Sequence, residues 1–178
     1  MHGRKDKAMA KKATETKKQE LEATNVKVCG TITDLMYGRR TYANGRKDKE
    51  DKYRMSLKLA AGEMEKFIEA CRPYYEDAEE TYIPKFLKDD ASEDDLEYLN
   101  LKSGFDFGFV QKTATGFDEI GGVNDVLDDN GNINGSKVVV TIKIKEGAFY
   151  PVAVCIVELH KKSLADFFDA SDFEDLPF

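Results

Sequence analysis

The residues of this sequence that could do chemistry are mainly cations and aromatic rings gathered in one polar segment, residues 37–54. A single nucleic-acid strand is bound without sequence preference by cations that follow the phosphates and by aromatic faces on which bases stack. This segment supplies both, and we predict that it forms the main nucleic-acid contact. Its candidate residues are Tyr37, Arg39, Arg40, Tyr42, Arg46, Lys47, Lys49, Lys52, Tyr53 and Arg54. The alternative is a charged hairpin whose tyrosines only shield a sheet.

Two further groups of residues could extend this contact. Phe105, Phe107 and Phe109 alternate along one predicted strand and could stack on bases, although we expect at least two of them in the core. A lysine face could line a groove, and a solvated sheet face is the equal alternative; its residues are Lys137, Lys143 and Lys145, with Lys58 and Lys112. These groups add five residues to the predicted DNA contact: Lys58, Phe105, Phe107, Lys112 and Lys143.

The sequence offers little to an enzyme or a metal ion. It has no Walker-type phosphate loop and no Gly-x-Gly-x-x-Gly, and its only histidines are His2 and His160. Its three cysteines lie far apart among apolar neighbours, which argues against a zinc site or a disulfide framework. The acidic pairs Asp89-Asp90, Asp94-Asp95 and Asp128-Asp129 could hold a metal ion, but they lie in hydrophilic, turn-like runs, and residues 128–135 lack the final glutamate of an EF-hand loop. We therefore expect no catalytic residues, no metal site and no cofactor.

The elements that must position these side chains are predicted to be mainly strands. Apolar and polar residues alternate over residues 26–32, 53–59 and 138–144, as in strands with one buried face. Residues 96–110 also indicate a strand, and the nearly continuous apolar run 151–159 indicates one that is buried on both faces. Five such strands with long loops predict a mainly β fold, a five-stranded barrel like the oligonucleotide-binding (OB) fold.

Turn and helix signals complete the predicted barrel. Asn44-Gly45 predicts a hairpin turn. The apolar spacing over residues 62–71 predicts one short amphipathic helix, which Pro73 is expected to end. Residues 74–95 are expected to form an acidic, irregular insertion, and residues 128–135 a turn.

Length and charge divide the chain into three predicted parts. Its 178 residues are enough for one domain with a hydrophobic core, and its net charge is −7. We predict a basic N-terminal arm over residues 1–24, an OB-fold-like single-stranded DNA-binding domain over residues 25–162 and a disordered acidic tail over residues 163–178. No apolar run reaches the ~20 residues of a membrane span, and the basic N-terminus lacks the apolar stretch of a signal peptide. These features predict a cytoplasmic protein with no membrane partner.

The most specific feature of the sequence is its C-terminus, which alternates acids with aromatic rings and closes in Asp-Phe-Glu-Asp-Leu-Pro-Phe. This ending resembles the acidic tip of bacterial single-stranded DNA-binding proteins, which typically close in Asp-Asp-Ile-Pro-Phe. In that family the tip binds replication, recombination and repair enzymes. The resemblance implies a partner-binding segment that consists of Asp172, Phe173, Glu174, Asp175, Leu176, Pro177 and Phe178.

The order of the predicted elements is similar to that of phage single-stranded DNA-binding proteins. Those proteins have an OB-fold core, an early helix, long insertions and an acidic aromatic tail attached directly to the barrel. The likeness covers residues 25–178 as a pattern. It implies a viral protein in the cytoplasm of a bacterial host, whose tail binds a polymerase, a primase-helicase or a nuclease, and it leaves a homodimer open.

Together these features predict sequence-independent binding of single-stranded DNA in DNA replication, recombination and repair, without enzymatic activity. The acidic tail is expected to occupy the cationic groove when DNA is absent. The alternative is an acidic DNA mimic or interaction module that binds a host DNA-processing enzyme, which the basic segment 37–54 disfavours. A metal-dependent nuclease is a third class, and the lack of a His/Asp/Glu constellation disfavours it.

Overall fold

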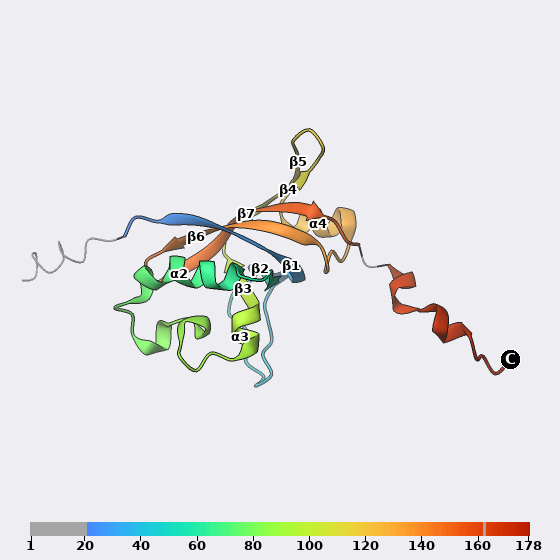
Figure 1. The fold of residues 1–178 in the computed structure, drawn as a ribbon, viewed down its shortest axis with the longest axis horizontal. Helices are drawn as coiled ribbons and strands as arrows, with labels where there is room; N and C mark the ends of the chain where they lie inside the picture. The colour runs from blue at the N-terminus through green and yellow to red at the C-terminus, as the bar shows by residue number, and fades with distance from the viewer. Residues whose placement is uncertain (1–20, 162) are drawn as a thin grey trace, which may run out of the picture.

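The alternating segments form one seven-stranded mixed sheet in the computed structural model, which describes residues 21–161 and 163–178 (Figure 1). The strand order is β3-β2-β1-β6-β7-β4-β5, and every neighbouring pair is antiparallel except β4 with β7. The strands are β1 (Thr24–Gly38), β2 (Lys52–Leu59), β3 (Tyr98–Ser103), β4 (Gly108–Lys112), β5 (Phe117–Gly121), β6 (Lys137–Lys145) and β7 (Ala148–Glu158). The helices are α2 (Glu63–Tyr75), α3 (Glu93–Glu97) and α4 (Val123–Asn130), with short 3₁₀ turns η1 (Glu80–Tyr82), η2 (Lys85–Leu87), η3 (Leu164–Phe167) and η4 (Ala170–Phe173).

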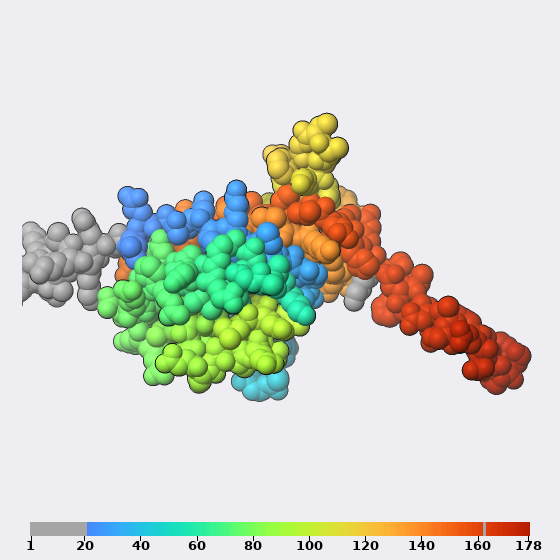
Figure 2. All heavy atoms as spheres, viewed as in Figure 1, coloured from blue at the N-terminus to red at the C-terminus, as the bar shows by residue number. Residues whose placement is uncertain are grey.

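The predicted five-stranded OB-fold-like barrel is wrong, because this sheet stays open. Closure would require β7 to pair with β3, but the outer edge of β7 is taken by β4, which runs parallel to it from Gly108 to Gln111. β5 then extends the sheet beyond β4 as a hairpin that projects from the body (Figures 1 and 2). β3 and β7 approach each other, yet no ladder joins them in the described part of the chain. The fold is therefore α/β with an open mixed sheet.

The predicted helix over residues 62–71 is confirmed as α2, but the expectation of a single short helix is wrong. α2 passes through Pro73, which removes one backbone hydrogen bond, and continues to Tyr75, whose buried side chain favours the last turn. Two further helices occupy segments that were expected to be irregular or turn-forming. α4 extends into the predicted turn at residues 128–135 and ends before Gly131, whose φ of 68° suits glycine.

The core lies where α2 packs against the sheet. Phe67 on α2 is fully buried, and its ring centroid lies 5.4 Å from those of Phe86 and Phe149. Phe107 and Phe109 are also buried, with ring centroids 5.7 Å apart. The expectation that at least two of the three phenylalanines near β4 lie in the core is therefore confirmed.

The C-terminal segment is not disordered as predicted, because it forms the two turns η3 and η4. In each turn a carboxylate accepts a hydrogen bond from the backbone N–H of the residue three positions before it: Ser163 N–H donates to Asp166 Oδ2 at 2.8 Å, and Asp169 N–H donates to Asp172 Oδ2 at 2.7 Å. The segment leads away from the end of β7 and stands clear of the sheet (Figures 1 and 2). It is an ordered, solvent-exposed appendage.

The start of the appendage is fixed to the body by Ser136, which is fully buried. Its hydroxyl accepts a hydrogen bond from the His160 N–H at 2.8 Å and donates one to the His160 carbonyl oxygen at 3.1 Å. The chain is therefore held at His160, just before the appendage begins.

At the other end of the chain, most of the arm predicted over residues 1–24 lies outside the described residues, and β1 begins at Thr24. No helix in the described part of the chain is long and apolar enough to cross a membrane.

Candidate nucleic-acid interface

A groove of about 730 Å³ runs along β2 and β3, between the β1–β2 loop, the segment after α2 and the β6–β7 turn. Five basic side chains line it: Arg40, Lys52, Arg54, Lys102 and Lys145. No aspartate or glutamate is among the described residues that line it, although the chain contains 34 acids. The groove thus concentrates positive charge on a protein of net charge −7, and an anionic ligand suits it.

Aromatic rings accompany the cations in this groove. Tyr82 and Phe105 are 72% and 82% exposed, so their faces are available for stacking. Tyr42 and Tyr150 also line the groove, and the Nζ of Lys145 lies 5.5 Å from the ring centroid of Tyr150. Cations and exposed rings in one groove are the combination that binding of a single nucleic-acid strand requires.

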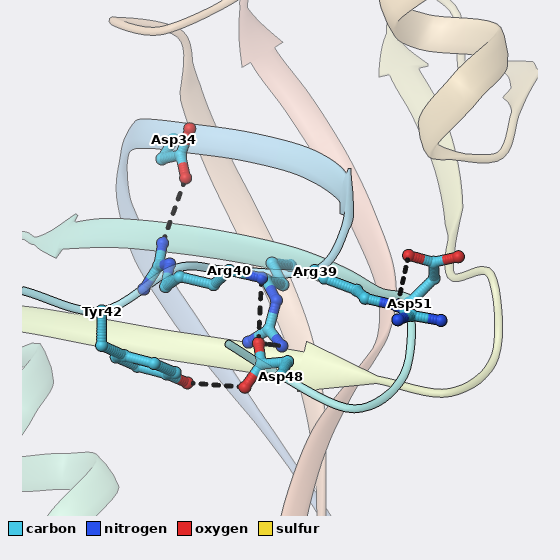
Figure 3. Close-up of polar contacts among 7 residues, drawn as sticks. Asp34, Arg39, Arg40, Tyr42, Asp48 and Asp51 are labelled. Carbon is cyan, nitrogen blue, oxygen red and sulfur yellow. Dashed lines mark hydrogen bonds and ion pairs between the residues drawn. The ribbon is translucent and has the colours of Figure 1, made fainter. Parts of the chain in front are cut away.

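The β1–β2 loop, which forms one wall of the groove, is folded around the carboxylate of Asp48 (Figure 3). This carboxylate accepts hydrogen bonds from the Arg40 N–H and the Tyr42 hydroxyl, both at 3.1 Å, and pairs with the guanidinium of Arg54 on β2. Partial loss of water raises the pKa of Asp48, but Arg40, Tyr42 and Arg54 outweigh this and hold it below its ordinary value. The network is therefore complete above the ordinary carboxyl range and is lost only as the pH falls through the lowered pKa.

The hairpin turn predicted at Asn44-Gly45 is confirmed within this loop. Gly45 has a φ of 84°, and its N–H donates to the Tyr42 carbonyl oxygen at 2.8 Å. The Arg46 guanidinium lies 4.6 Å from the centroid of the Tyr42 ring. The turn therefore brings a second arginine against the ring that faces Asp48.

Three of the predicted arginines already have a carboxylate partner within the protein. The pairs are Arg39–Asp51 at 3.6 Å, Arg40–Asp34 at 3.2 Å and Arg54–Asp48 (Figure 3). The first two pairs are well exposed to water, where such pairs contribute little and exchange readily. The third differs, because the Arg54 side chain is only 7% exposed.

The groove brings together five of the predicted DNA contacts and leaves the others outside it. Those that line it are Arg40, Tyr42, Lys52, Arg54 and Phe105. Along β2 successive side chains face opposite sides of the sheet, so Tyr53 lies on the other side from Lys52 and Arg54 and stacks on Tyr37 at 4.4 Å between ring centroids. Phe107 is in the core. The remaining predicted contacts outside the groove are Arg39, Arg46, Lys47, Lys49, Lys58, Lys112 and Lys143.

Three residues of the groove with a cationic or accessible aromatic side chain, Lys102, Tyr82 and Tyr150, were missed by the sequence-based prediction, whereas Lys145 was predicted only as part of a lysine face that could line a groove. Tyr82 ends the turn η1 after α2, Lys102 lies on β3, and Lys145 and Tyr150 flank the β6–β7 turn. Lys145 does carry a signal, since it belongs to the alternating lysines of β6. Lys102 becomes a groove residue because β3 pairs with β2 and places it opposite Arg54. That pairing is a long-range contact, which local spacing does not reveal.

Acidic residues and apolar residues each recur every three positions along the C-terminal appendage. Acids stand at Asp166, Asp169, Asp172 and Asp175, and apolar side chains at Leu164, Phe167, Phe173 and Leu176 follow the same period. A 3₁₀ helix has about three residues per turn, so side chains three positions apart within η3, or within η4, lie above one another. The terminal Phe178 is 99% exposed. The predicted partner-binding residues thus lie together on a segment that other molecules can reach.

No group of three or more His, Cys, Asp or Glu side chains that could hold a metal ion is found in residues 21–161 and 163–178. The sequence matches no protein-family model, and no curated protein matches it.

Proposed function

We propose that this protein binds single-stranded DNA without sequence preference during DNA replication and recombination, with the strand in the groove along β2 and β3. The observation that carries the proposal is the lining of this groove, which combines five cations with four accessible rings and contains no described acid. Cations track the phosphates, and the rings stack on the bases. Stacking requires unpaired bases, so a duplex is a poorer ligand.

The appendage fits the same proposal as a recruiting segment. Its apolar residues Phe173, Leu176 and Phe178 are exposed to solvent, and Glu174 and Asp175 lie between the first two. Exposed apolar side chains at a chain end favour association with other proteins. We propose that this segment binds replication proteins, such as a polymerase, and that its acids compete with DNA for the groove.

Titration of a fluorescent oligothymidine is the first test. The protein should bind it more tightly than a duplex of equal length, because only unpaired bases can stack on the rings. Affinity should fall with salt at a log–log slope of about −0.7 per phosphate contacted. Anisotropy at two salt concentrations, with an oligouridine alongside, measures both effects. Equal affinity for duplex and single strand would contradict the stacking argument, and no binding at all would favour an acidic mimic.

Loss of the exposed rings should weaken this binding. Tyr82→Ala and Phe105→Ala each remove one stacking surface, and we expect about 1–3 kcal/mol less binding free energy per base that loses its stack. The salt slope should stay the same, because no charge changes. Phe117→Ala is the matched control, since Phe117 is 67% exposed but lies on β5 outside the groove. An equal loss in the control would point to non-specific apolar contact.

A further inference from the structure

One carboxylate ties the loop wall of the groove to its floor. Asp48 lies on the β1–β2 loop and receives the Arg40 N–H, the Tyr42 hydroxyl and the Arg54 guanidinium. Arg40 and Tyr42 line the groove from the loop, whereas Arg54 lines it from β2. Removal of this carboxylate would therefore release the loop from the strand.

Arg54, which makes this contact from the floor of the groove on β2, has an unsatisfied hydrogen-bond donor. The side chain of Arg54 is 7% exposed, and its Nε–H is buried without an acceptor in the described part of the protein. A buried donor that lacks an acceptor is unfavourable, and the cost is recovered when an acceptor reaches it. Arg54 also stands opposite Lys102 in the β2–β3 ladder, so the surrounding floor offers donors and positive charge.

We infer that Asp48 is the positioning residue of the groove and that Arg54, which it holds, donates a fixed hydrogen bond to an oxygen of the bound strand. This inference rests on the proposed function and names a contact within it. The acceptor is a phosphate oxygen or a carbonyl oxygen of a base, since both match a guanidinium. When the strand enters, the loop adjusts so that the buried Nε–H reaches that oxygen, while Asp48 holds the guanidinium through Nη2.

The decisive experiment compares two substitutions that change the charge of the same loop equally. Asp48→Asn and Asp51→Asn each remove one negative charge, and Asp51 pairs only with the exposed Arg39 among the described residues. Charge alone predicts tighter DNA binding for both variants. The inference predicts different results for the two variants: Asp48→Asn binds oligothymidine roughly tenfold more weakly, whereas Asp51→Asn binds equally well or slightly more tightly. Tighter binding by Asp48→Asn would overturn the inference.

A second variant tests the donor and keeps the carboxylate of Asp48 and a cation beside it. Arg54→Lys keeps the charge but removes the Nε–H and the planar fork. We expect roughly tenfold weaker binding with an unchanged salt slope. Asp48→Asn combined with Arg54→Lys should be little worse than either change alone, because both act on one contact. Wild-type affinity in Arg54→Lys, or simple addition of the two losses, would contradict the inference.

An abasic oligomer separates the two sources of the acceptor oxygen. It keeps the phosphodiester backbone and lacks every base. If the loss in Arg54→Lys persists with this ligand, the acceptor is a phosphate, and if it disappears, the acceptor is a base. Thermal unfolding of each variant by circular dichroism checks that the sheet is intact.

Failure of the inference is distinguishable from failure of the proposed function. If wild-type protein binds oligothymidine through the groove but Asp48→Asn behaves like Asp51→Asn, the function stands and the positioning role falls. If the wild-type protein binds no oligonucleotide, both fall.

Discussion

Replacement of Lys102 and Lys145 by Glu in one protein is expected to weaken oligothymidine binding on the order of a hundredfold at low salt. These two lysines line the groove from β3 and from the end of β6, and neither has a carboxylate partner among the described residues. The variant loses two cations that release counterions on binding, and it gains two acids that repel phosphates. The salt slope should become shallower by about 0.7 for each phosphate that is no longer neutralised. Anisotropy titration over a salt series measures both quantities.

The matched control carries the same change of net charge outside the groove. Lys27→Glu with Lys88→Glu alters two basic residues that lie on β1 and just after η2, neither of which lines the groove. We expect this double variant to lose no more than a few-fold in affinity, through the general field of the protein. If the two double variants weakened binding equally, net charge and not the groove would govern the interaction.

Deletion of residues 163–178 is expected to strengthen DNA binding, by roughly tenfold at low salt. The deletion removes five acids and no base, so the remaining protein is less negative. Sixteen residues reach about 50 Å only when fully extended, so the turns η3 and η4 must unfold for a segment attached near His160 to sample the groove. A tethered competitor acts at an effective concentration on the order of millimolar, so even weak contacts with the cations count. Titrations at low and high salt should show the gain shrinking as charge is screened.

Removal of Phe178 alone separates competition from recruitment. All five acids remain in this variant, so DNA affinity should barely change, whereas binding to a replicative polymerase should drop. The deletion should leave the sheet intact, because the appendage stands clear of it (Figure 2). A deletion that left DNA affinity unchanged at low salt would show that the tail does not visit the groove. A deletion that abolished folding would make the tail part of the body.

The local part of the fold was predictable from the sequence. Alternation along Val26–Ile32 and Val138–Ile144 correctly indicated strands, and the Asn44-Gly45 turn and the helix near Phe67 followed from local spacing. Whether the sheet closes into a barrel was not predictable in this way, because closure depends on which strand pairs with the free edge of β7. β4 takes it over four residue pairs, and nothing in the alternation of those residues names their partner.

In the candidate site, too, local features were predictable from the sequence and long-range contacts were not. The cations of the β1–β2 loop were visible as a cluster, but the alternation of β2 assigns Tyr53 to the opposite side from Arg54. The composition of the segment does not indicate that Asp48 organises the loop. From the sequence alone, one acid among many bases only lowers the net positive charge of the segment. Only the folded chain reveals that it holds three donors at one point.

The strand order also has a consequence for synthesis of the chain. β1 pairs along its first half with β6, so Lys27 meets Thr141, and the groove is completed by the β6–β7 turn. Pairings between segments so distant in the chain form slowly, and an incomplete chain leaves the central edge of β1 exposed. A nascent chain on the ribosome therefore cannot assemble the groove until β6 and β7 have emerged.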